Sequence, residues 1–519
     1  MAIASTEVNN PKVRQVARTI ATNSAANVTR IAVASLVSIF LPAYLTHHLP
    51  AETYGAWVLI LQLSAYVGYL DLGVQTAVSR YIAEFEAKQD YAGRDRCASA
   101  GLVITLGASA LGGVLAIILA WQVPAVLRSM PHALDHDVRL GVLFVGVSLS
   151  ASLATSVFVA IFLGLQRYQI MMVITITSRL LFGAVICAAV ASHSGLAAMG
   201  AAAASVNILT ALLQVAAWRR LAPHIRVSLR IVDVQMLKKL LKYCAALTVW
   251  SACMLFVSGL DITIVGHYSY GETAYYAVAA SPTSLMLMIV GALMGPLLPA
   301  TSAMSVQRSS QQMGSVLTRS TRYATIVLLL IGLPFLVAGH FILRLWVGPV
   351  YAAHSVQFLR ILIIANIIRN LCAPYATMVV ATCRQWVATA AAVTEGLVNL
   401  ASSIWLAQHI GALGVAVGTL LGAVAGVVMH FAVSMRYTQA TLTISRIELF
   451  VKGMLRPAAV AIPSALVMWF SWPVRPSHAT LYLYCGWIIS TLLLAWFVSM
   501  SQTDRALLVG IYGDKATVS

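Results

Sequence analysis

The chain has 519 residues, of which 60% are hydrophobic and only 9% charged, and its mean hydropathy is +0.86. A soluble protein of this length needs many more charged side chains to cover its surface, so the composition excludes that class and indicates a polytopic membrane protein. The net charge of +17 is typical of a membrane chain whose Lys and Arg collect in cytoplasmic loops. No platform of basic and aromatic residues for nucleic-acid bases is found, so we expect no nucleic-acid partner.

The apolar runs are about 20 residues long, which is the length of a membrane-spanning helix rather than of a barrel strand. In chain order, the predicted spans are 25–47, 54–77, 98–127, 139–164, 169–191, 195–218, 244–267, 273–303, 322–346, 354–380, 385–408, 411–435, 453–474 and 479–500. We therefore predict an all-α polytopic membrane protein with about fourteen transmembrane helices.

Loop charges test this count. With the N-terminus inside, most of the 33 Lys and Arg residues fall in segments predicted to be cytoplasmic, whereas the outside segments hold Arg128, Arg139, Arg344 and Arg475. This bias predicts that both termini are cytoplasmic. The N-terminal stretch is polar and leads straight into the first span, so we expect no cleavable signal peptide.

The spans divide into two sets of six. The longest polar connection, 219–243, carries seven basic residues and separates the first six spans from the next six, with two spans left over. His48 and the Glu52-Thr53 pair recur as His267 and the Glu272-Thr273 pair, an offset of about 220 residues that indicates a parallel repeat. We predict an N-terminal lobe at 1–218, a basic cytoplasmic linker at 219–243, a C-terminal lobe at 244–436, and helices 13 and 14 with a tail at 437–519.

The most specific motif lies between His48 and Glu84. It combines Tyr54-Gly55 and Trp57 with Asp71-Leu72-Gly73 and a following helix that carries Arg80. This order resembles the second helix of Wzx-type polysaccharide flippases, a branch of the multidrug/oligosaccharidyl-lipid/polysaccharide exporter superfamily. The resemblance implies two six-helix lobes that face each other across a central cavity, with two further helices that accommodate a polyprenyl tail.

Several predicted spans carry polar side chains at helical spacing, and five such helices imply a shared wet surface. An ion near the bilayer centre costs at least about 2.5 kcal/mol, which makes these residues functional candidates. The candidate substrate-binding residues are Arg179, Arg369, Arg30, Asn366, Asn370 and Asn399, and the candidate ion-coupling or gating residues are Glu395, Asp261 and Asp71.

Each candidate also has a structural interpretation. Arg30 stands at the start of its span, where snorkelling to the inner surface explains it equally well. Asp71 and Asp261 lie toward the ends of their helices and suit capping or pairing as well as function. Arg179 and Glu395 have the same predicted depth on corresponding helices, so we predict that they meet across the cavity in one transport state; a permanent structural pair is the alternative.

An enzyme is not expected. No predicted external segment is long enough for a catalytic domain, and no Gly-Lys-Ser/Thr loop that would cradle ATP phosphates is found. The seven cysteines are scattered, without a CxxC pair or a neighbouring His cluster, so we expect no metal, no cofactor and no disulfide framework.

Transport is the remaining class. Arginines in the membrane and basic entrances suit an anionic diphosphate better than a cationic drug. We therefore predict a flippase that moves a polyprenyl-diphosphate-linked oligosaccharide across the bacterial inner membrane for surface or exopolysaccharide assembly, by alternating access coupled to a proton or sodium gradient or the membrane potential. Its expected partners are membrane lipids and, in the same pathway, polysaccharide polymerase and export proteins. A lipid II flippase and a drug/cation antiporter of the same superfamily are the alternatives.

Overall fold

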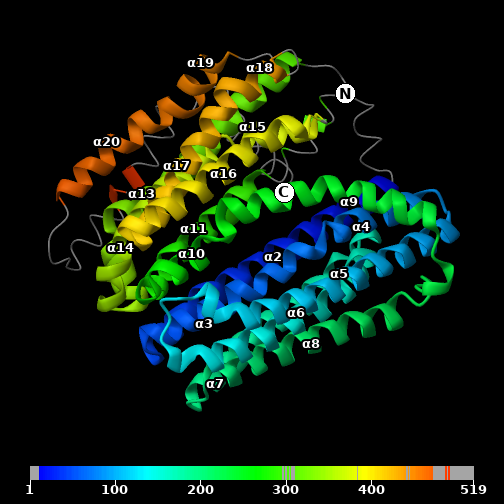
Figure 1. Cartoon of the computed structure of the whole chain (residues 1–519). Helices are drawn as coiled ribbons and strands as arrows, with labels where there is room; N and C mark the ends of the chain where they lie inside the picture. Colours follow the sequence, from blue (N-terminus) through cyan, green and yellow to red (C-terminus); the bar gives the residue numbers. More distant parts are fainter. Residues whose placement is uncertain are drawn as a thin grey trace, which may run out of the picture. The chain divides into compact units, whose positions relative to one another are not determined.

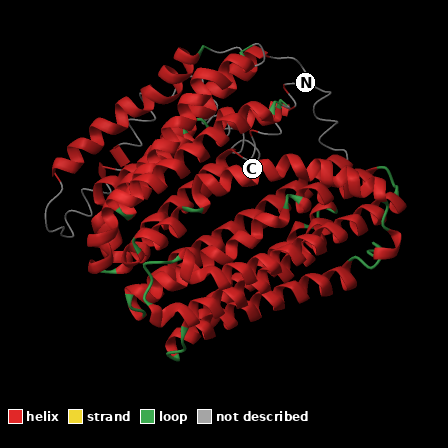
Figure 2. Cartoon of the chain, in the orientation of Figure 1, coloured by secondary structure: helices red, strands yellow, loops and turns green. Residues whose placement is uncertain are grey.

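The computed structural model describes residues 11–294, 310–382, 384–439 and 445–471, together with a few single positions. Throughout these residues the secondary structure is helical and contains no strand (Figure 2). Among the described residues, eleven helices are long and apolar enough to cross a membrane, or twelve when the bent pair Ser251–Val257 and Asp261–Tyr268 is counted as one span. The prediction of an all-α polytopic membrane protein is confirmed, while the span predicted at 479–500 lies almost wholly outside the described residues.

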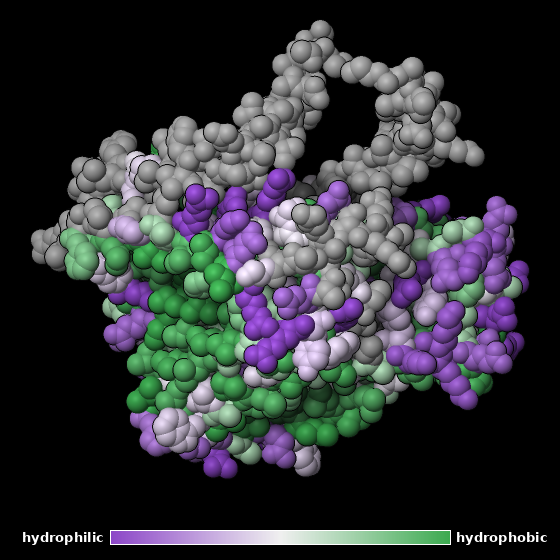
Figure 3. Space-filling view, turned by 90° about the horizontal axis from the view of Figure 1, so that it is seen from above, coloured by the Kyte–Doolittle hydropathy of each residue, from purple (hydrophilic) through white to green (hydrophobic). Residues whose placement is uncertain are grey.

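The surface explains why these helices need a membrane. Large apolar side chains are exposed along most of them, with Trp121 83% and Phe470 84% exposed. Figure 3 shows broad apolar areas (green) beside hydrophilic ones (purple). Exposing such a surface to water is unfavourable. In lipid it is stable, because the side chains are apolar and each helix satisfies its own backbone hydrogen bonds.

The chain divides into two compact units. Unit 1 comprises Met1–Leu255 with Ile262–Ala277, and unit 2 comprises Phe256–Asp261 with Val278–Ser519. The described helices of unit 1 are α2 (Pro11–His48), α3 (Ala51–Ala65), η1 (Tyr66–Asp71), α4 (Val74–Ala87), α5 (Tyr91–Val126), η2 (His132–Leu134), α6 (Asp135–Gly164), α7 (Tyr168–Ala191), α8 (Leu196–Leu221), η3 (Leu229–Ile231), α9 (Val234–Met254), most of α10 (Asp261–Tyr268) and η5 (Tyr270–Glu272) (Figure 1).

Small residues and polar pairs hold α6 against α8. A Cβ added to Gly200 would lie 2.8 Å from the Cα of Gly141, so the two backbones are in contact. The amide of Asn207 donates to Ser148 Oγ at 3.0 Å, a bond between helices of the kind that supports packing in lipid. The small-residue run at 195–205 thus provides close helix packing.

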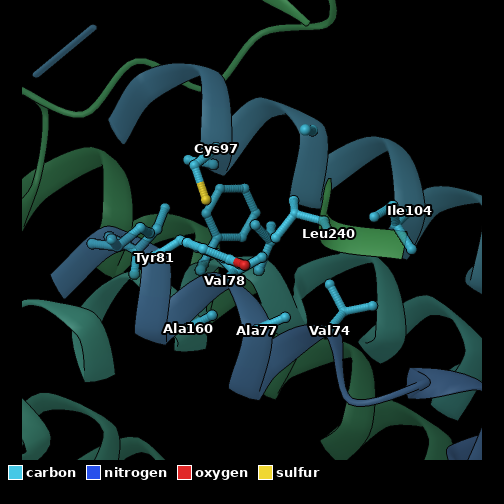
Figure 4. Packing of buried hydrophobic residues seen from close by; sticks show 14 of the residues in the cluster. Val74, Ala77, Val78, Tyr81, Cys97, Ile104, Ala160 and Leu240 are labelled. Atoms are coloured by element: carbon cyan, nitrogen blue, oxygen red, sulfur yellow. The ribbon is translucent and has the colours of Figure 1, made fainter. Parts of the chain in front are cut away.

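The linker is tied to unit 1 by both apolar and charged contacts. Leu240 of α9 is fully buried in a core cluster that includes Val78 and Cys97 (Figure 4). Arg94, only 3% exposed, donates to the carbonyl oxygen of His224 at 3.0 Å and pairs with Glu86 at 2.9 Å. Residues 219–243 are thus an ordered part of unit 1.

The Asp-Leu-Gly motif breaks the span Ala51–Ala87. The 3-10 turn η1 ends at Asp71, and both Leu72 (φ 52°) and Gly73 (φ 71°) then adopt the left-handed conformation. Leucine rarely adopts this conformation, and residues held in it cluster at functional sites. The carboxylate of Asp71 therefore lies at an interruption of the helix.

The two segments that echo each other in sequence are in contact. The hydroxyl of Tyr270 donates to the carbonyl oxygen of Glu52 at 2.7 Å. A Cβ on Gly55 would lie 3.5 Å from the backbone nitrogen of Ala274. Mutual contact is what equivalent segments close to a pseudo-twofold axis would make, which supports the predicted repeat.

Unit 2 contains the rest of the described chain. Its helices are η4 (Leu255–Gly259), most of α11 (Thr273–Met294), α13 (Ser310–Val347), α14 (Pro349–Asn370), α15 (Ala373–Ala381), α16 (Gln385–Ile410), α17 (Ala412–Met429), η6 (His430–Ser434), α18 (Met435–Thr438), α19 (Arg446–Glu448), η7 (Leu449–Leu455) and α20 (Arg456–Ser471). The consecutive helices α16 and α17 pack against each other, and α14 lies against α17.

Candidate functional site

A buried ion pair joins α14 to α16. Arg369 Nε donates to Glu395 Oε1, and the two side chains are only 13% and 12% exposed. The Nη2 atom of Arg369 also reaches the carbonyl oxygen of Val257 at 3.4 Å. Arg369 lies near the point where α14 ends and the shorter helix α15 begins, which places this charge inside the span Pro349–Ala381.

A carboxylate and an amide lie beside this pair. The amide of Asn399 donates to the carbonyl oxygens of Val257 at 2.8 Å and Phe256 at 3.1 Å, and lies 3.4 Å from Asp261 Oδ1. Thr419 Oγ1 donates to Asp261 Oδ2 at 3.1 Å. Asp261 is thus held by donors from both α16 and α17.

A break in the helix explains why backbone carbonyls take part. The π-helical turn η4 ends at Gly259, and α10 begins at Asp261. The helical segments Ser251–Val257 and Asp261–Tyr268 are bent by 41° relative to each other. Such breaks release backbone oxygens from the regular ladder, and inside a membrane neighbouring side chains must satisfy them. Asn399 and Arg369 do so here.

A glycine stripe on α17 makes room for the polar face of α16. A Cβ on Gly426 would lie 2.8 Å from Glu395 Oε2, and one on Gly422 would lie 2.7 Å from Asn399 Cβ. One turn further, a Cβ on Gly418 would lie 2.6 Å from the backbone nitrogen of Ser403. The polar residues therefore lie against bare backbone, and the small residues of α17 allow the two helices to pack closely.

We call these residues the unit 2 polar cluster: Phe256, Val257, Asp261, Arg369, Glu395, Asn399, Ser403 and Thr419. Carboxylate, amide, hydroxyl and carbonyl oxygens converge in it, which are the ligands that a hard cation such as Na⁺ prefers and which also suit a carboxyl group that exchanges a proton. A guanidinium that can bind an anion lies alongside.

Two predicted asparagines face their own helix. Asn366 donates to the carbonyl oxygen of Leu362 at 2.9 Å, and Asn370 donates to that of Asn366 at 2.8 Å. Both are buried in α14. Within the described residues, the Oδ1 atom of Asn366 has no hydrogen-bond partner, so one acceptor of this stripe is open.

The other predicted residues belong to unit 1. Asp71, at the break after η1, accepts a hydrogen bond from Ser156 Oγ at 3.3 Å. Arg179 is exposed on α7, and among the described residues it makes no hydrogen bond or ion pair. Arg30 is half-buried on α2. The Arg179–Glu395 gate stays a prediction, since these residues belong to different units and Glu395 is bound to Arg369.

Sequence reasoning missed part of the cluster. It did not include Ser403 of α16, whose Oγ donates to Asn399 Oδ1 at 3.0 Å. It also missed Thr419 and the helix break after Leu255. The available signal was a shared spacing, because polar residues recur every fourth position in α16 as glycines do in α17.

No protein-family model and no curated protein matches the chain. Solved structures share its fold. A lipid II flippase, MurJ, in an inward closed conformation has 13% identity and a TM-score of 0.68 over 91% of this chain and 98% of that one. An inward-facing multidrug resistance MATE family transporter of the MOP superfamily has 15% identity and a TM-score of 0.63, with coverage of 80% and 99%. An outward-facing multidrug resistance MATE family transporter has 15% identity and a TM-score of 0.60, with coverage of 81% of this chain and 96% of that one.

Proposed function

We propose that the protein is a flippase that moves a polyprenyl-diphosphate-linked oligosaccharide across the bacterial inner membrane for surface or exopolysaccharide assembly. The observation that carries the proposal is the buried Arg369–Glu395 pair beside Asp261, inside spans of a chain with a transporter fold. Ions are costly in a membrane, and a protein whose role is only structural has no need of them. They suit a chain that binds a charged substrate and an ion in turn.

The substrate head group is the natural competitor for the arginine. A diphosphate offers planar pairs of oxygens to a guanidinium, as Glu395 does, and carries more charge. When it binds Arg369, Glu395 loses its partner and takes a proton instead of remaining a buried anion. Arg179 and Arg30 of unit 1 are the further candidates for holding the diphosphate.

The carboxylates of Asp261 and Asp71 couple transport to the ion gradient. Asp261 lies beside the amide nitrogen of Asn399 and the hydroxyl of Thr419, where its carboxylate binds either a sodium ion or a proton. Asp71 is the corresponding candidate in unit 1. Ion binding at a helix break can favour one of the two access states, because the span already bends at that position.

Lipid II and a cationic drug are the alternative substrates. The alignment with the lipid II flippase covers 91% of the chain against 80% for the inward-facing multidrug transporter, which favours a flippase over a drug/cation antiporter. Between the two flippases, the Tyr-Gly-x-Trp and Asp-Leu-Gly motifs favour the polysaccharide branch. A lipid II flippase is therefore the second candidate.

A flippase of this kind would have the topology and the lobes that the sequence predicts. Both termini and the linker 219–243 lie in the cytoplasm, and the lobes 1–218 and 244–436 rock against each other, with the segment 437–519 beside the lipid tail. No residue acts as a catalyst. Polymerase and export proteins of the same pathway take the flipped substrate onward.

Two arginine variants test the anion-binding role. Arg179→Ala and Arg369→Lys are expected to lower polysaccharide export at least tenfold in cells that depend on this chain, with protein levels near normal. Arg369→Lys keeps a charge for Glu395 but loses the fork that grips a phosphate with two bonds. Arg226→Ala, an exposed arginine of the linker, is the control and should export normally. Wild-type export from both test variants would contradict the role.

A further inference from the structure

Two cations share one aromatic surface where α4 meets α9 in unit 1. Lys239 Nζ lies 4.4 Å from the ring centroid of Tyr81, and Arg80 Cζ lies 5.8 Å from the same centroid. Arg80 Cζ is also 5.2 Å from the ring centroid of Tyr243. The rings of Tyr243 and Tyr81 pack edge-on, with 6.1 Å between their centroids. Arginine and lysine are thus held on one ring, although like charges repel.

The aromatic support is fixed while the charges are open. Tyr81 is only 8% exposed and lies across the core cluster beneath Cys97 and next to Leu240 (Figure 4). The side chains of Arg80 and Lys239 are exposed. Buried rings beneath two exposed cations hold both near one position, so that a ligand can contact both at a small entropic cost.

The nearby carboxylate of Glu84 attracts Arg80 and Lys239 but forms its ion pair with another cation. Glu84, one turn after Arg80, pairs with Lys88 at 2.6 Å, and Asp233 lies 4.0 Å from Arg96. In the part of the chain that the structure describes, no carboxylate lies within ion-pair distance of Arg80 or Lys239. Glu84 brings one negative charge against the three cations Arg80, Lys239 and Lys88, so a bound anion of more than one charge would further relieve the repulsion between Arg80 and Lys239.

The surroundings indicate a ligand that arrives on a lipid. On the exposed side of α9, the apolar side chains of Val234 and Leu241 alternate with Lys238 and Lys242. Exposed apolar residues between cations are typical of a helix at the level of lipid head groups. A soluble anion would need no such apolar rim.

We propose that Arg80 and Lys239 form a docking site for the diphosphate of a polyprenyl-linked substrate, which binds there before it enters the transport pathway. The substrate class rests on the proposed function. Arg80 grips two oxygens of one phosphoryl group with its fork, and Lys239 neutralises the second phosphoryl group as a point charge. Binding of a single anionic phospholipid leaves one of the two cations without a partner.

Native mass spectrometry of the full chain, released from phosphatidylcholine nanodiscs, tests the site with geranylgeranyl diphosphate as the probe. The double variant Arg80→Gln with Lys239→Gln is expected to weaken binding of this probe at least tenfold. The matched control, Arg226→Gln with Arg230→Gln, removes the same amount of charge from exposed positions of the linker and should stay within twofold of wild type. Equal weakening in both would reduce the effect to general surface charge and overturn the site.

Two further arms identify the ligand. Geranylgeranyl monophosphate and phosphatidylglycerol should each bind the wild type at least tenfold more weakly than the diphosphate, and inorganic pyrophosphate should bind more weakly because it lacks the lipid. Phosphatidylglycerol that binds as tightly as the diphosphate would overturn the assignment. If the site binds as expected while no substrate is flipped, only the proposed function falls; if flipping stands and the double variant binds normally, only the docking site falls.

Discussion

Arg369→Ala is expected to lower the stability of the protein by about 3–5 kcal/mol, the usual result of removing one member of a buried ion pair. Glu395 would then be left as a carboxylate that is only 12% exposed, inside a membrane span. The carbonyl oxygen of Val257 would keep its bond from Asn399, so the loss isolates the charge pair. Thermal unfolding of the purified chain in lipid nanodiscs measures the effect.

The paired variant Arg369→Met with Glu395→Met separates stability from function. Because it removes both charges and keeps similar volume, its unfolding temperature should return close to that of the wild type. Export should nevertheless be absent, since the guanidinium that binds the diphosphate is gone. A double variant that exports normally would show that the pair is only structural.

Gly418→Ala is expected to destabilise the protein by about 1–3 kcal/mol through overpacking. The new Cβ would lie 2.6 Å from the backbone nitrogen and 2.7 Å from the Cα of Ser403, and backbone atoms cannot rotate away. Since this pushes α17 off the polar face of α16, transport should fall with stability. The measurement is again the unfolding temperature in nanodiscs, together with export.

Gly291→Ala in α11 is the matched control, because a Cβ there has no atom within 4 Å. Alanine in an open helical position usually stabilises by about 0.5–1 kcal/mol relative to glycine. The two variants should therefore shift the unfolding temperature in opposite directions. A Gly418→Ala protein that is as stable as Gly291→Ala would refute the close packing of α16 on α17.

The sequence predicted the helices well because their signal is local. Runs of apolar residues, one about 20 residues long for each crossing, identify spans without knowledge of their neighbours. The helical spacing of Glu395 and Asn399 likewise placed them on one face of α16. The Asp-Leu-Gly motif marked the segment in which the second span breaks, although the left-handed conformation of Leu72 was not predicted.

Partner choice was the part that sequence could not supply. Depth in the bilayer and direction around one helix are readable, but which helix lies opposite is not. The bonded partner of Glu395 is Arg369 of α14, a pairing that the sequence did not predict, while the meeting with Arg179 in one transport state stays a prediction. The π-helical turn at Leu255 was equally hidden, because a turn of that kind has no residue signature and depends on side chains that arrive from α16.

The most direct test of the account is the movement of a fluorescent polyprenyl-diphosphate-linked oligosaccharide in proteoliposomes that contain the purified chain. Substrate is placed in both leaflets, and the outer share is read by a membrane-impermeant quencher under a sodium gradient, a proton gradient or a membrane potential. The account predicts movement that one of these drives, that Arg369→Lys slows at least tenfold, and that loses its dependence on the gradient in Asp261→Asn. Lipid II that moves faster would favour the second candidate. A cationic drug that is exchanged while the diphosphate-linked sugar stays in its leaflet would contradict the account.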